Sequence, residues 1–374
     1  MNTPALRAEC AQKLLAASAQ ISRLTAFVGL DGFVDDIVHA VDKRENAESF
    51  ERLPTIAKFA ERLSAAAGQS TNIELVNQRT KLGGNGPIMA NALARFGIKV
   101  TYLGTLGYPN LHPVFNAFAD VAQVNSIAEP GHTDALEFED GKVMLGKSFH
   151  LKEVNWVNIH ARYGQDKFAE QLSSADLVGF VNWTMIPYMS DIWQSIQAEL
   201  CPKFGERRRI IFFDLADPEK RSLEDISQAL ELIAGFERYF DVILGLNEKE
   251  AYEIGKVLAL ATNDRSAEGL STLAREIHCR LAIRTLMVHP VTFALAVSDG
   301  IVDLVEGPHV AKPLITTGAG DHFNSGFCLG KLLGLDNRMS LLTGVASSGY
   351  YVRTGHSPTV EELAGMLRNW PRKK

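Results

Sequence analysis

Cysteine is scarce in this chain, and basic charge is not in excess. The 374 residues include four cysteines, which lie far apart and form none of the spacings of a zinc site. We therefore expect reduced thiols and a cytoplasmic protein. The ten histidines contain no His-x-x-x-His pair. The net charge of −6 argues against nucleic acid as a partner, because such a partner calls for a basic face.

Long apolar segments, internal repeats and low-complexity linkers are also absent from the sequence. A membrane-spanning helix needs about 20 apolar residues, and no run approaches that length. The run LLAASA near the N-terminus is short and follows the acidic Glu9, so an amphipathic first helix fits it better than a signal peptide. We therefore expect no membrane partner and a single domain over residues 1–374.

Short apolar runs alternate with helical patterns along most of the chain. The runs are nearly continuous and rich in Val, Ile and Phe, as in strands that are buried on both faces of a parallel sheet. Between them lie stretches with helix punctuation, such as Pro87 and Gly97 around one helix and the capping Ser222 before another. The pattern predicts a three-layer α/β/α domain with a mostly parallel central sheet. The expected strands are TAFVGL (25–30), VTYLG (100–104), ADLVGFVNW (175–183), RIIFFDL (209–215) and DVILGLN (241–247).

Two stretches interrupt this alternation. Residues 31–45 mix apolar and acidic positions directly after the first expected strand, and residues 132–152 alternate apolar and polar positions around Asp140-Gly141. Alternation around an Asp-Gly pair is a strong signal for a β-hairpin. We therefore expect both stretches to contribute to a small β lid over the mouth of the sheet.

The stretch DGKVMLGKS (140–148) matches the phosphate-loop pattern G-x-x-x-x-G-K-[ST]. A phosphate loop must follow a buried strand and open a helix. Here an Asp-Gly turn comes first, the interior of the motif is itself strand-like, and no capped helix follows. We therefore predict that Gly141 is a turn glycine and that Lys147 is a surface or lid cation.

A glycine-rich helix start lies near the C-terminus, where Ile315-Thr316-Thr317 leads into Gly318-Ala319-Gly320 and Asp321. Free backbone N–H groups at a helix start bind anions, and glycines let a phosphate approach them closely. A carboxylate beside such a site would repel the phosphate, but it has a purpose as a general base on an attacking hydroxyl. Alternatively, Asp321 caps the helix and the glycines form a tight turn. Spacing alone leaves both interpretations open.

The run TTGAGDHF (316–323) resembles the D-T-x-G-A-G-D-x-F signature of the ribokinase-like (PfkB) carbohydrate kinases. Other segments are similar to this family in the expected order along nearly the whole chain. They are KLGGNGPIMANALARFGIKVTYLGTLG (81–107), similar to the Gly-Gly signature; NEKE (247–250), similar to the N-x-x-E motif; and ASSGYYVRTGHSPTVEEL (346–363), similar to the segment that flanks the nucleotide base. The GAGD signature is the most specific of these, and N-x-x-E alone is weak.

The resemblance implies an ATP-dependent kinase that phosphorylates a hydroxyl group of a sugar or sugar-like alcohol. Asp321 would be the general base, and the N–H groups of Gly318, Ala319 and Gly320 would form the anion hole. The nucleotide would contact Thr317, Gly318, Gly320, Asn247 and Ser347. Asn247 and Glu250 would hold Mg²⁺, partly through water. The same pair is also the sequence signature of a helix capping box, and both interpretations can hold at once.

The sugar is expected at the carboxyl ends of the strands. Carboxylates commonly accept hydrogen bonds from polyol hydroxyls, and of the three aspartates after the first strand we favour Asp31 and Asp35 over Asp36. The Gly83-Gly84-Asn85 segment would also contact the sugar, although a plain turn before the helix explains it too. Trp183 could stack on a sugar ring, and core packing fits it at least as well.

Three departures from the family pattern leave the donor and the sugar open. Ile315 replaces the first signature aspartate, His289-Pro290 replaces a strand-end glycine of the nucleotide pocket, and Tyr108-Pro109-Asn110 lacks the usual aspartate. ADP as the donor, a nucleoside kinase of the same family and a non-catalytic sugar- or nucleotide-binding relative remain alternatives. Dimerisation through lid strands is common among relatives, so we expect a homodimer by analogy alone.

Overall fold

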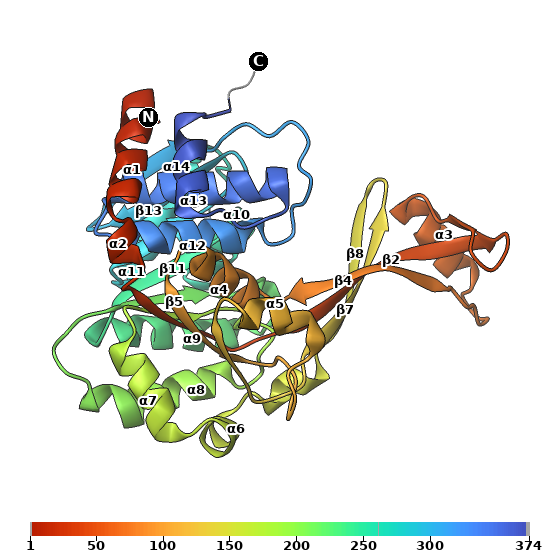
Figure 1. Ribbon diagram of the computed structural model, residues 1–374, viewed down its shortest axis with the longest axis horizontal. Helices are drawn as coiled ribbons and strands as arrows, with labels where there is room; N and C mark the ends of the chain where they lie inside the picture. The colour runs from red at the N-terminus through yellow and green to blue at the C-terminus, as the bar shows by residue number, and fades with distance from the viewer. Residues whose placement is uncertain (1, 261, 372–374) are drawn as a thin grey trace.

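A nine-stranded sheet forms the centre of the molecule (Figure 1). The computed structural model describes residues 2–260 and 262–371. From β6 to β12 the neighbouring strands are parallel, and β13 and β14 continue the sheet as antiparallel strands. In spatial order the strands are β6 (Gln123–Ser126), β5 (Lys99–Gly104), β1 (Thr25–Gly29), β9 (Leu177–Phe180), β10 (Ile210–Asp214), β11 (Asp241–Leu246), β12 (Thr285–Val288), β13 (Phe293–Ser298) and β14 (Ile301–Glu306).

Helices cover both faces of this sheet, which confirms the three-layer prediction. Along β1, Phe27 packs into the core under one face and Val28 into the core under the other, as expected for a strand buried on both sides. One face carries α6 (Trp156–Arg162), α7 (Gln165–Ser174), α8 (Met189–Ser195), α9 (Leu223–Gly235), α10 (Glu248–Val257) and α11 (Ala267–Leu281). The other carries α1 (Pro4–Ala16), α4 (Asn85–Arg95), α12 (Ala319–Leu332), α13 (Asn337–Thr354) and α14 (Val360–Arg368).

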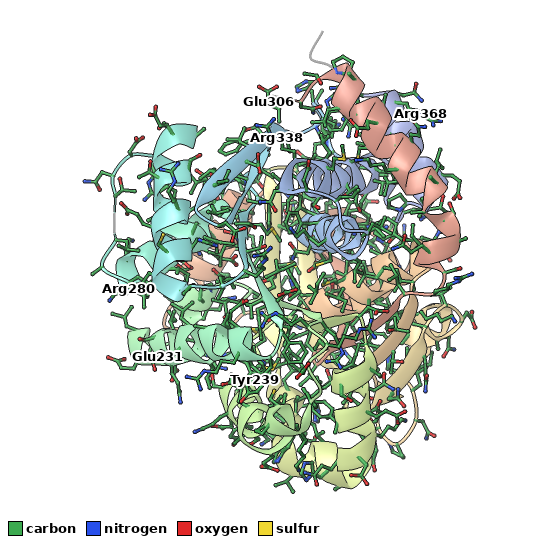
Figure 2. The ribbon with its side chains drawn as sticks, turned by 90° about the vertical axis from the view of Figure 1, so that its left-hand side faces the viewer. Glu231, Tyr239, Arg280, Glu306, Arg338 and Arg368 are labelled. Carbon is green, nitrogen blue, oxygen red and sulfur yellow. The ribbon has the colours of Figure 1, made fainter. Side chains whose placement is uncertain are left out.

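Charged side chains lie on the outer surfaces of these helices. Glu231 of α9 and Arg280 of α11 are exposed and point away from the body (Figure 2). Two short helices, α2 (Ser18–Ile21) and α5 (Asn116–Ala119), lie in the connections before β1 and β6. Among residues 2–260 and 262–371, no helix is both long enough and apolar enough to span a membrane.

The five strands predicted from apolar runs are all present and lie in the parallel part of the sheet. They are β1, β5, β9, β10 and β11, with ends within a few residues of the expected ones. The helix that was expected after Ser222 is α9, and the Ser222 side chain accepts a hydrogen bond from the amide of Asp225. Helix capping and the burial of continuous apolar runs therefore determine the parallel strands and α9.

A second, smaller sheet projects from the body, at the right of Figure 1. We call it the lid sheet. Its strands are β2 (Phe33–Arg44), β3 (Phe50–Arg52), β4 (Leu75–Gly83), β7 (Gly131–Phe138) and β8 (Gly141–Lys147). Strands β2, β7 and β8 lie in the two segments that interrupt the sequence pattern, whereas β3, β4 and the helix α3 (Ile56–Ala65) were not predicted. The single-domain organisation over residues 1–374 stays a prediction.

The phosphate-loop pattern at residues 140–148 forms part of a hairpin, as predicted. Phe138 of β7 pairs with Gly141 of β8, and the strand then continues to Lys147. The Lys147 ammonium is exposed and lies 2.9 Å from the Asp134 carboxylate on the neighbouring strand. The segment therefore has strand geometry where a phosphate loop needs a helix start.

We predict that Lys147→Ala changes neither nucleotide turnover nor the apparent affinity for nucleotide by more than about two-fold, because an exposed ion pair contributes little. Steady-state kinetics over a range of nucleotide concentrations would measure this. Loss of turnover in a folded variant would contradict the hairpin assignment and restore a phosphate loop.

Candidate active site

Polar residues gather where four neighbouring strands of the main sheet end. Asp31 follows β1, Asn182 follows β9, Asp214 is the last residue of β10, and Asn247 directly follows β11. These strands are adjacent and parallel, so their carboxyl ends meet at one edge, where open α/β sheets bind ligands. The Asn182 amide donates to Oδ2 of Asp31 at 2.7 Å, which links two of the strand ends directly.

Asp321 lies at the start of α12 and faces this edge. Its carboxylate is almost fully enclosed, and Nδ2 of Asn85, at the start of α4, donates to its Oδ1 at 3.0 Å. Burial raises the pKa of Asp321 to about 7; the Asn85 hydrogen bond opposes this shift, and the charges of Asp31 and Glu250 add to it. A carboxylate with a pKa near neutrality can take a proton during a reaction and release it afterwards.

The Gly318–Gly320 segment forms the first turn of α12 directly before Asp321. Gly318 has a φ of +92°, a backbone conformation that strongly favours glycine. Among the residues described, the N–H groups of Gly318 and Gly320 have no hydrogen-bond acceptor, whereas the N–H of Ala319 donates to the carbonyl of Thr316 at 3.1 Å. Two of the three amides expected in the anion hole are therefore free to bind an anion.

Two aromatic side chains bind the backbone carbonyls of this turn. The Tyr351 hydroxyl donates to the carbonyl of Thr317 at 3.0 Å, and Nδ1 of His322 lies 2.7 Å from the carbonyl of Gly318. The two rings stack with their centroids 3.7 Å apart. Burial lowers the pKa of His322 to about 4, so this histidine is neutral and serves as a structural support.

The structure places Asp31 beneath the site and not on its surface. Asp31 is fully buried, and its Oδ2 and Oδ1 accept hydrogen bonds from the backbone N–H groups of Asn85 at 3.0 Å and Gly86 at 2.9 Å. The Tyr102 hydroxyl lies 3.3 Å from Oδ1. Burial raises the pKa of Asp31 to about 6, and the four hydrogen-bonding groups around it oppose that shift. With its oxygens engaged in this way, Asp31 is better suited to fixing α4 than to contacting a sugar.

Asp35 lies on the lid sheet, next to the glycine segment that precedes α4. A Cβ atom added to Gly83 would lie 2.4 Å from Oδ1 of Asp35, so only glycine lets the carboxylate occupy this position. Burial raises the pKa of Asp35, while the charge of Lys81 opposes the shift. Asp36 points to the other face of the strand, where its Oδ1 accepts a hydrogen bond from Asn77 at 2.9 Å.

A further pair of buried carboxylates lies beside Asp321. Glu250 accepts hydrogen bonds from the backbone N–H groups of Asn247 and Asp217, both at 2.8 Å, and Asn247 completes the expected capping box. Burial raises the pKa values of Glu250 and Asp214; the charge of Asp214 raises that of Glu250 further, and the charge of Asp321 raises that of Asp214. Asn324 of α12 donates to Asp214 at 2.8 Å.

Sequence reasoning missed three residues of this site: Asn182, Asp214 and Asn324. Asp214 had a signal, because it ends an expected strand of the parallel sheet, where functional groups gather. Asn182 and Asn324 had none, since an amide that follows a strand or lies in a helix has no distinctive spacing. The side-chain carbonyls of both asparagines are buried and without a hydrogen-bond partner among the described residues.

Two residues lie inside the core. Ser347 has no exposed surface, and its Cβ is 2.9 Å from the position that a Cβ on Gly326 of α12 would take. Its role in nucleotide binding therefore has no support from its position. Trp183 belongs to the core under the main sheet, and its indole N–H donates to Ser190 at 2.9 Å. Core packing is the better interpretation of Trp183.

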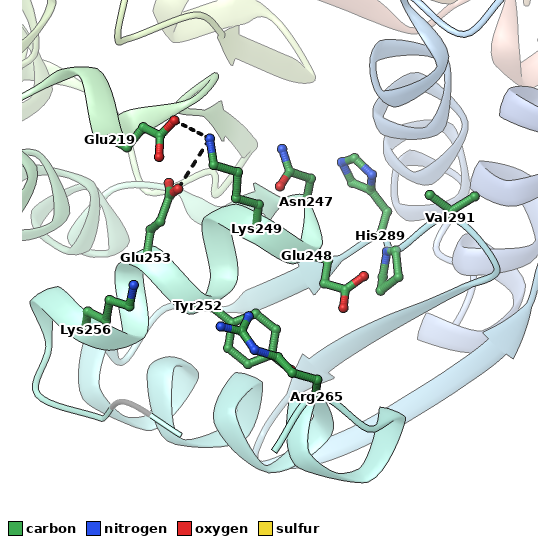
Figure 3. A pocket seen from close by; sticks show the side chains of 11 residues that line it. Glu219, Asn247, Glu248, Lys249, Tyr252, Glu253, Lys256, Arg265, His289 and Val291 are labelled. Carbon is green, nitrogen blue, oxygen red and sulfur yellow. Dashed lines mark hydrogen bonds and ion pairs between the residues drawn. The ribbon is translucent and has the colours of Figure 1, made fainter. Parts of the chain in front are cut away.

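A cavity of about 580 Å³ adjoins the site on the side of α10 (Figure 3). Asn247 and His289 line the side that is nearer to α12, and Lys249 lies opposite with its acidic partners. The guanidinium of Arg265 lies 3.7 Å from the ring centroid of Tyr252 at the base of the cavity. His289 also connects the cavity to the anion-binding turn, because its Cε1 lies 3.2 Å from where a Cβ on Gly320 would be.

Comparisons with known proteins agree with this architecture. A model of the prokaryotic ketohexokinase family matches residues 2–370. A ketohexokinase from Haloferax volcanii is 30% identical over 337 residues, which cover 90% of this chain and 88% of that protein.

Solved structures of low sequence identity share the fold. An Arabidopsis thaliana ribokinase complexed with ribose and ATP superposes with a TM-score of 0.62 at 16% identity, covering 92% of this chain and 98% of that one. A Methanocaldococcus jannaschii nucleoside kinase of the ribokinase family gives a TM-score of 0.59 at 14% identity, with coverages of 92% and 98%. The ribokinase-like fold expected from the motifs is therefore confirmed.

We predict that Asp31→Asn lowers kcat for phosphorylation on the order of 10- to 100-fold, with a smaller effect on the KM for the sugar. An asparagine would direct its NH₂ group at one of the two backbone donors, which would shift the start of α4 and the Asn85 amide, and small displacements near a reacting group are costly. If Asp31 acts through Asn85, the kcat of the double variant Asp31→Asn, Asn85→Ala should be only slightly lower than the kcat of either single variant. Additive losses would contradict this route.

Proposed function

Because this chain belongs to the prokaryotic ketohexokinase family and is a carbohydrate kinase, we propose that it transfers the γ-phosphoryl group of ATP to a hydroxyl group of a ketohexose. The observation that carries the proposal is the enclosed carboxylate of Asp321, held by Asn85 next to the free amides of Gly318 and Gly320. The family and the ketohexokinase relative support a ketohexose acceptor, and the ribokinase complex with ATP supports the donor.

In the proposed reaction, the sugar oxygen attacks the γ-phosphorus while the bond from that phosphorus to the bridging oxygen of ADP breaks. The carboxylate of Asp321 accepts the proton of the hydroxyl, and the bond electrons remain on ADP. The amides of Gly318 and Gly320 donate hydrogen bonds to the oxygens that gain charge. Positioning supplies much of the rate, since the phosphoryl group reacts through a loose transition state.

Asp35 is the residue that we assign to the sugar hydroxyls. It lies at the root of the lid sheet, and its carboxylate borders Gly83. Asn85 is less available to a sugar, because its backbone N–H donates to Asp31 and its side-chain amide donates to Asp321. The two glycines before Asn85 remain the part of the predicted sugar site where backbone groups can approach a hydroxyl.

The oxygen-rich donors beside Asp321 fit Mg²⁺. Asp214 and Glu250 are buried carboxylates whose pKa values are raised by burial, and the Asn324 carbonyl is buried without a partner among the described residues. A hard cation would offset the burial of both the carboxylate charges and this carbonyl. Asn247 and Glu250 would hold the ion, partly through water. When bound, Mg²⁺ would neutralise charge on the nucleotide phosphates. We place the nucleoside part of ATP in the cavity that His289 borders. The homodimer and the cytoplasmic location stay predictions.

The assignment is tested by a coupled phosphorylation assay with ATP and ADP as donors and with ketoses, aldoses, polyols and nucleosides as acceptors. We expect the highest kcat/KM for a ketohexose with ATP. A preference for nucleosides would instead favour the nucleoside kinase alternative, and binding without turnover would favour a non-catalytic relative.

We predict that Asp321→Asn lowers kcat by at least about 10²- to 10⁴-fold, the usual contribution of a general base. In the parent protein, turnover should rise as the pH increases through about 7, because Asp321 must lose its proton before it can act as the base. Thermal unfolding at pH 8 should show no loss of stability in the variant, since the substitution removes a buried charge. Unchanged turnover would contradict the role of Asp321.

We predict that Asp35→Asn raises the KM for the sugar about 10-fold or more, because hydrogen bonds to charged groups contribute about 1.5–3 kcal/mol. The matched control is Asp36→Asn, which changes the neighbouring aspartate on the opposite face of the same strand. Its KM should stay within about two-fold of the parent value. Equal effects of both substitutions would contradict the assignment of the sugar to Asp35.

A further inference from the structure

Two cations lie on the same face of the lid sheet as Asp35. In the antiparallel pairing of β2 with β4, Asp35 is opposite Lys81 and Ile37 is opposite Arg79. Residues directly opposite each other share a face, and so do residues two apart on one strand. Lys81, Arg79 and Asp35 therefore form one surface, which begins two residues before Gly83 and runs outward along the lid.

Among the described residues these two cations form no close ion pair, unlike most other cations of the lid. Among the residues described, neither the Lys81 ammonium nor the Arg79 guanidinium has a hydrogen-bond acceptor or an ion pair. The paired lid cations and their partners are Arg44 with Glu74, Arg52 with Glu139, Lys58 with Glu61, Arg62 with Asp42, Lys142 with Glu137, and Lys147 with Asp134. Lys43 on β2 likewise forms no ion pair with any residue that the structure describes, but it is exposed to solvent, whereas Lys81 is partly buried.

The position of Lys81 makes the lack of a partner unfavourable. Its side chain is partly buried, and burial lowers its pKa; Asp35 opposes that shift, and the charges of Lys142 and Arg79 add to it. A partly desolvated ammonium among other cations needs an anion to become favourable. The charge of Asp35 attracts Lys81, but the two form no close ion pair in the part of the chain that the structure describes.

The same surface reaches the anion-binding turn of α12. The Tyr351 hydroxyl, which donates to the carbonyl of Thr317, lies within the electrostatic influence of Asp321, Arg79 and Asp35. The chain itself links the lid surface to α12: β4 ends at Gly83, beside the Asp35 carboxylate, and Asn85, two residues later, donates to Asp321 at 3.0 Å. Lys81 and Arg79 therefore lie on the strand that leads directly to the contact between Asn85 and Asp321.

We propose that Lys81 and Arg79 form a binding site for a phosphate group, namely the phosphoryl group that passes from the nucleotide to the sugar and stays on the product. This inference rests on the proposed function. The bonds that form and break are those of the proposed reaction. The two cations would donate hydrogen bonds to the oxygens of the phosphoryl group, in addition to the amides of α12. The lid then supplies a sugar contact, Asp35, and a phosphate contact on one surface.

The test compares Lys81→Met and Arg79→Met with Lys147→Met, a lid lysine that already has a carboxylate partner. Calorimetric titration with inorganic phosphate measures the site without any turnover. We expect each of the first two substitutions to weaken phosphate binding about 10-fold and the control to leave it unchanged. With a neutral ketohexose, kcat should fall on the order of 10- to 100-fold while the KM for the sugar changes less than about two-fold.

A second set of assays with ketose phosphates as acceptors identifies the source of the phosphate. If only the turnover of phosphorylated acceptors falls in the two variants, the site exists but holds a phosphate that the acceptor already carries. If phosphate binding and both turnovers match those of Lys147→Met in folded variants, the proposal is wrong. Phosphate binding is measured without a sugar. If the parent protein phosphorylates no sugar, the proposed function is wrong, but the phosphate titrations still show whether Lys81 and Arg79 bind phosphate.

Discussion

The carboxylate of Asp31 joins three separate segments at the carboxyl edge of the main sheet. It accepts hydrogen bonds from the first backbone amides of α4 and from the Asn182 amide after β9, while its own chain position is set by β1. An anion at a helix start is favourable because the helix dipole and the free N–H groups both attract it. Asn85, the first residue of α4, then reaches Asp321 on α12. The geometry of the Asp321 carboxylate, the proposed general base, thus depends on a buried charge that has no exposed surface itself.

The buried carboxylates in this region lower the stability of the folded chain at high pH. The pKa values of Asp31, Asp214, Glu250 and Asp321 are all raised by burial, so the folded chain binds protons more tightly than the unfolded one. Stability from these groups therefore falls as the pH rises from about 4 to about 7. The buried sheet and helix contacts must offset this cost, as is common where function requires unfavourable electrostatics.

The parallel core and the glycine-rich helix start before Asp321 could be predicted from the sequence, because both depend on local patterns. Continuous apolar runs predict β1 and β10, and the glycines before Asp321 predict a helix start that binds an anion. The role of Asp31 could not be predicted in this way, since its hydrogen bonds join residues more than 50 positions apart. The lack of a close ion pair at Lys81 could not be predicted from the sequence either. It depends on the register of β2 and β4 and on which acidic side chains lie within contact distance among the described residues.

The lid sheet would couple the proposed sugar contact of Asp35 to the proposed phosphate contact of Lys81 and Arg79. Asp35 needs Gly83 beside it, and Lys81 lies opposite Asp35 on the same strand that ends in Gly83. A shift of β4 by one residue would turn Lys81 to the other face and place a side chain against Asp35. The register of one strand pair therefore determines both contacts at once. On the proposed function, a sugar that engages Asp35 would also bring its reacting hydroxyl towards Asp321 and the lid cations, where negative charge would develop during transfer.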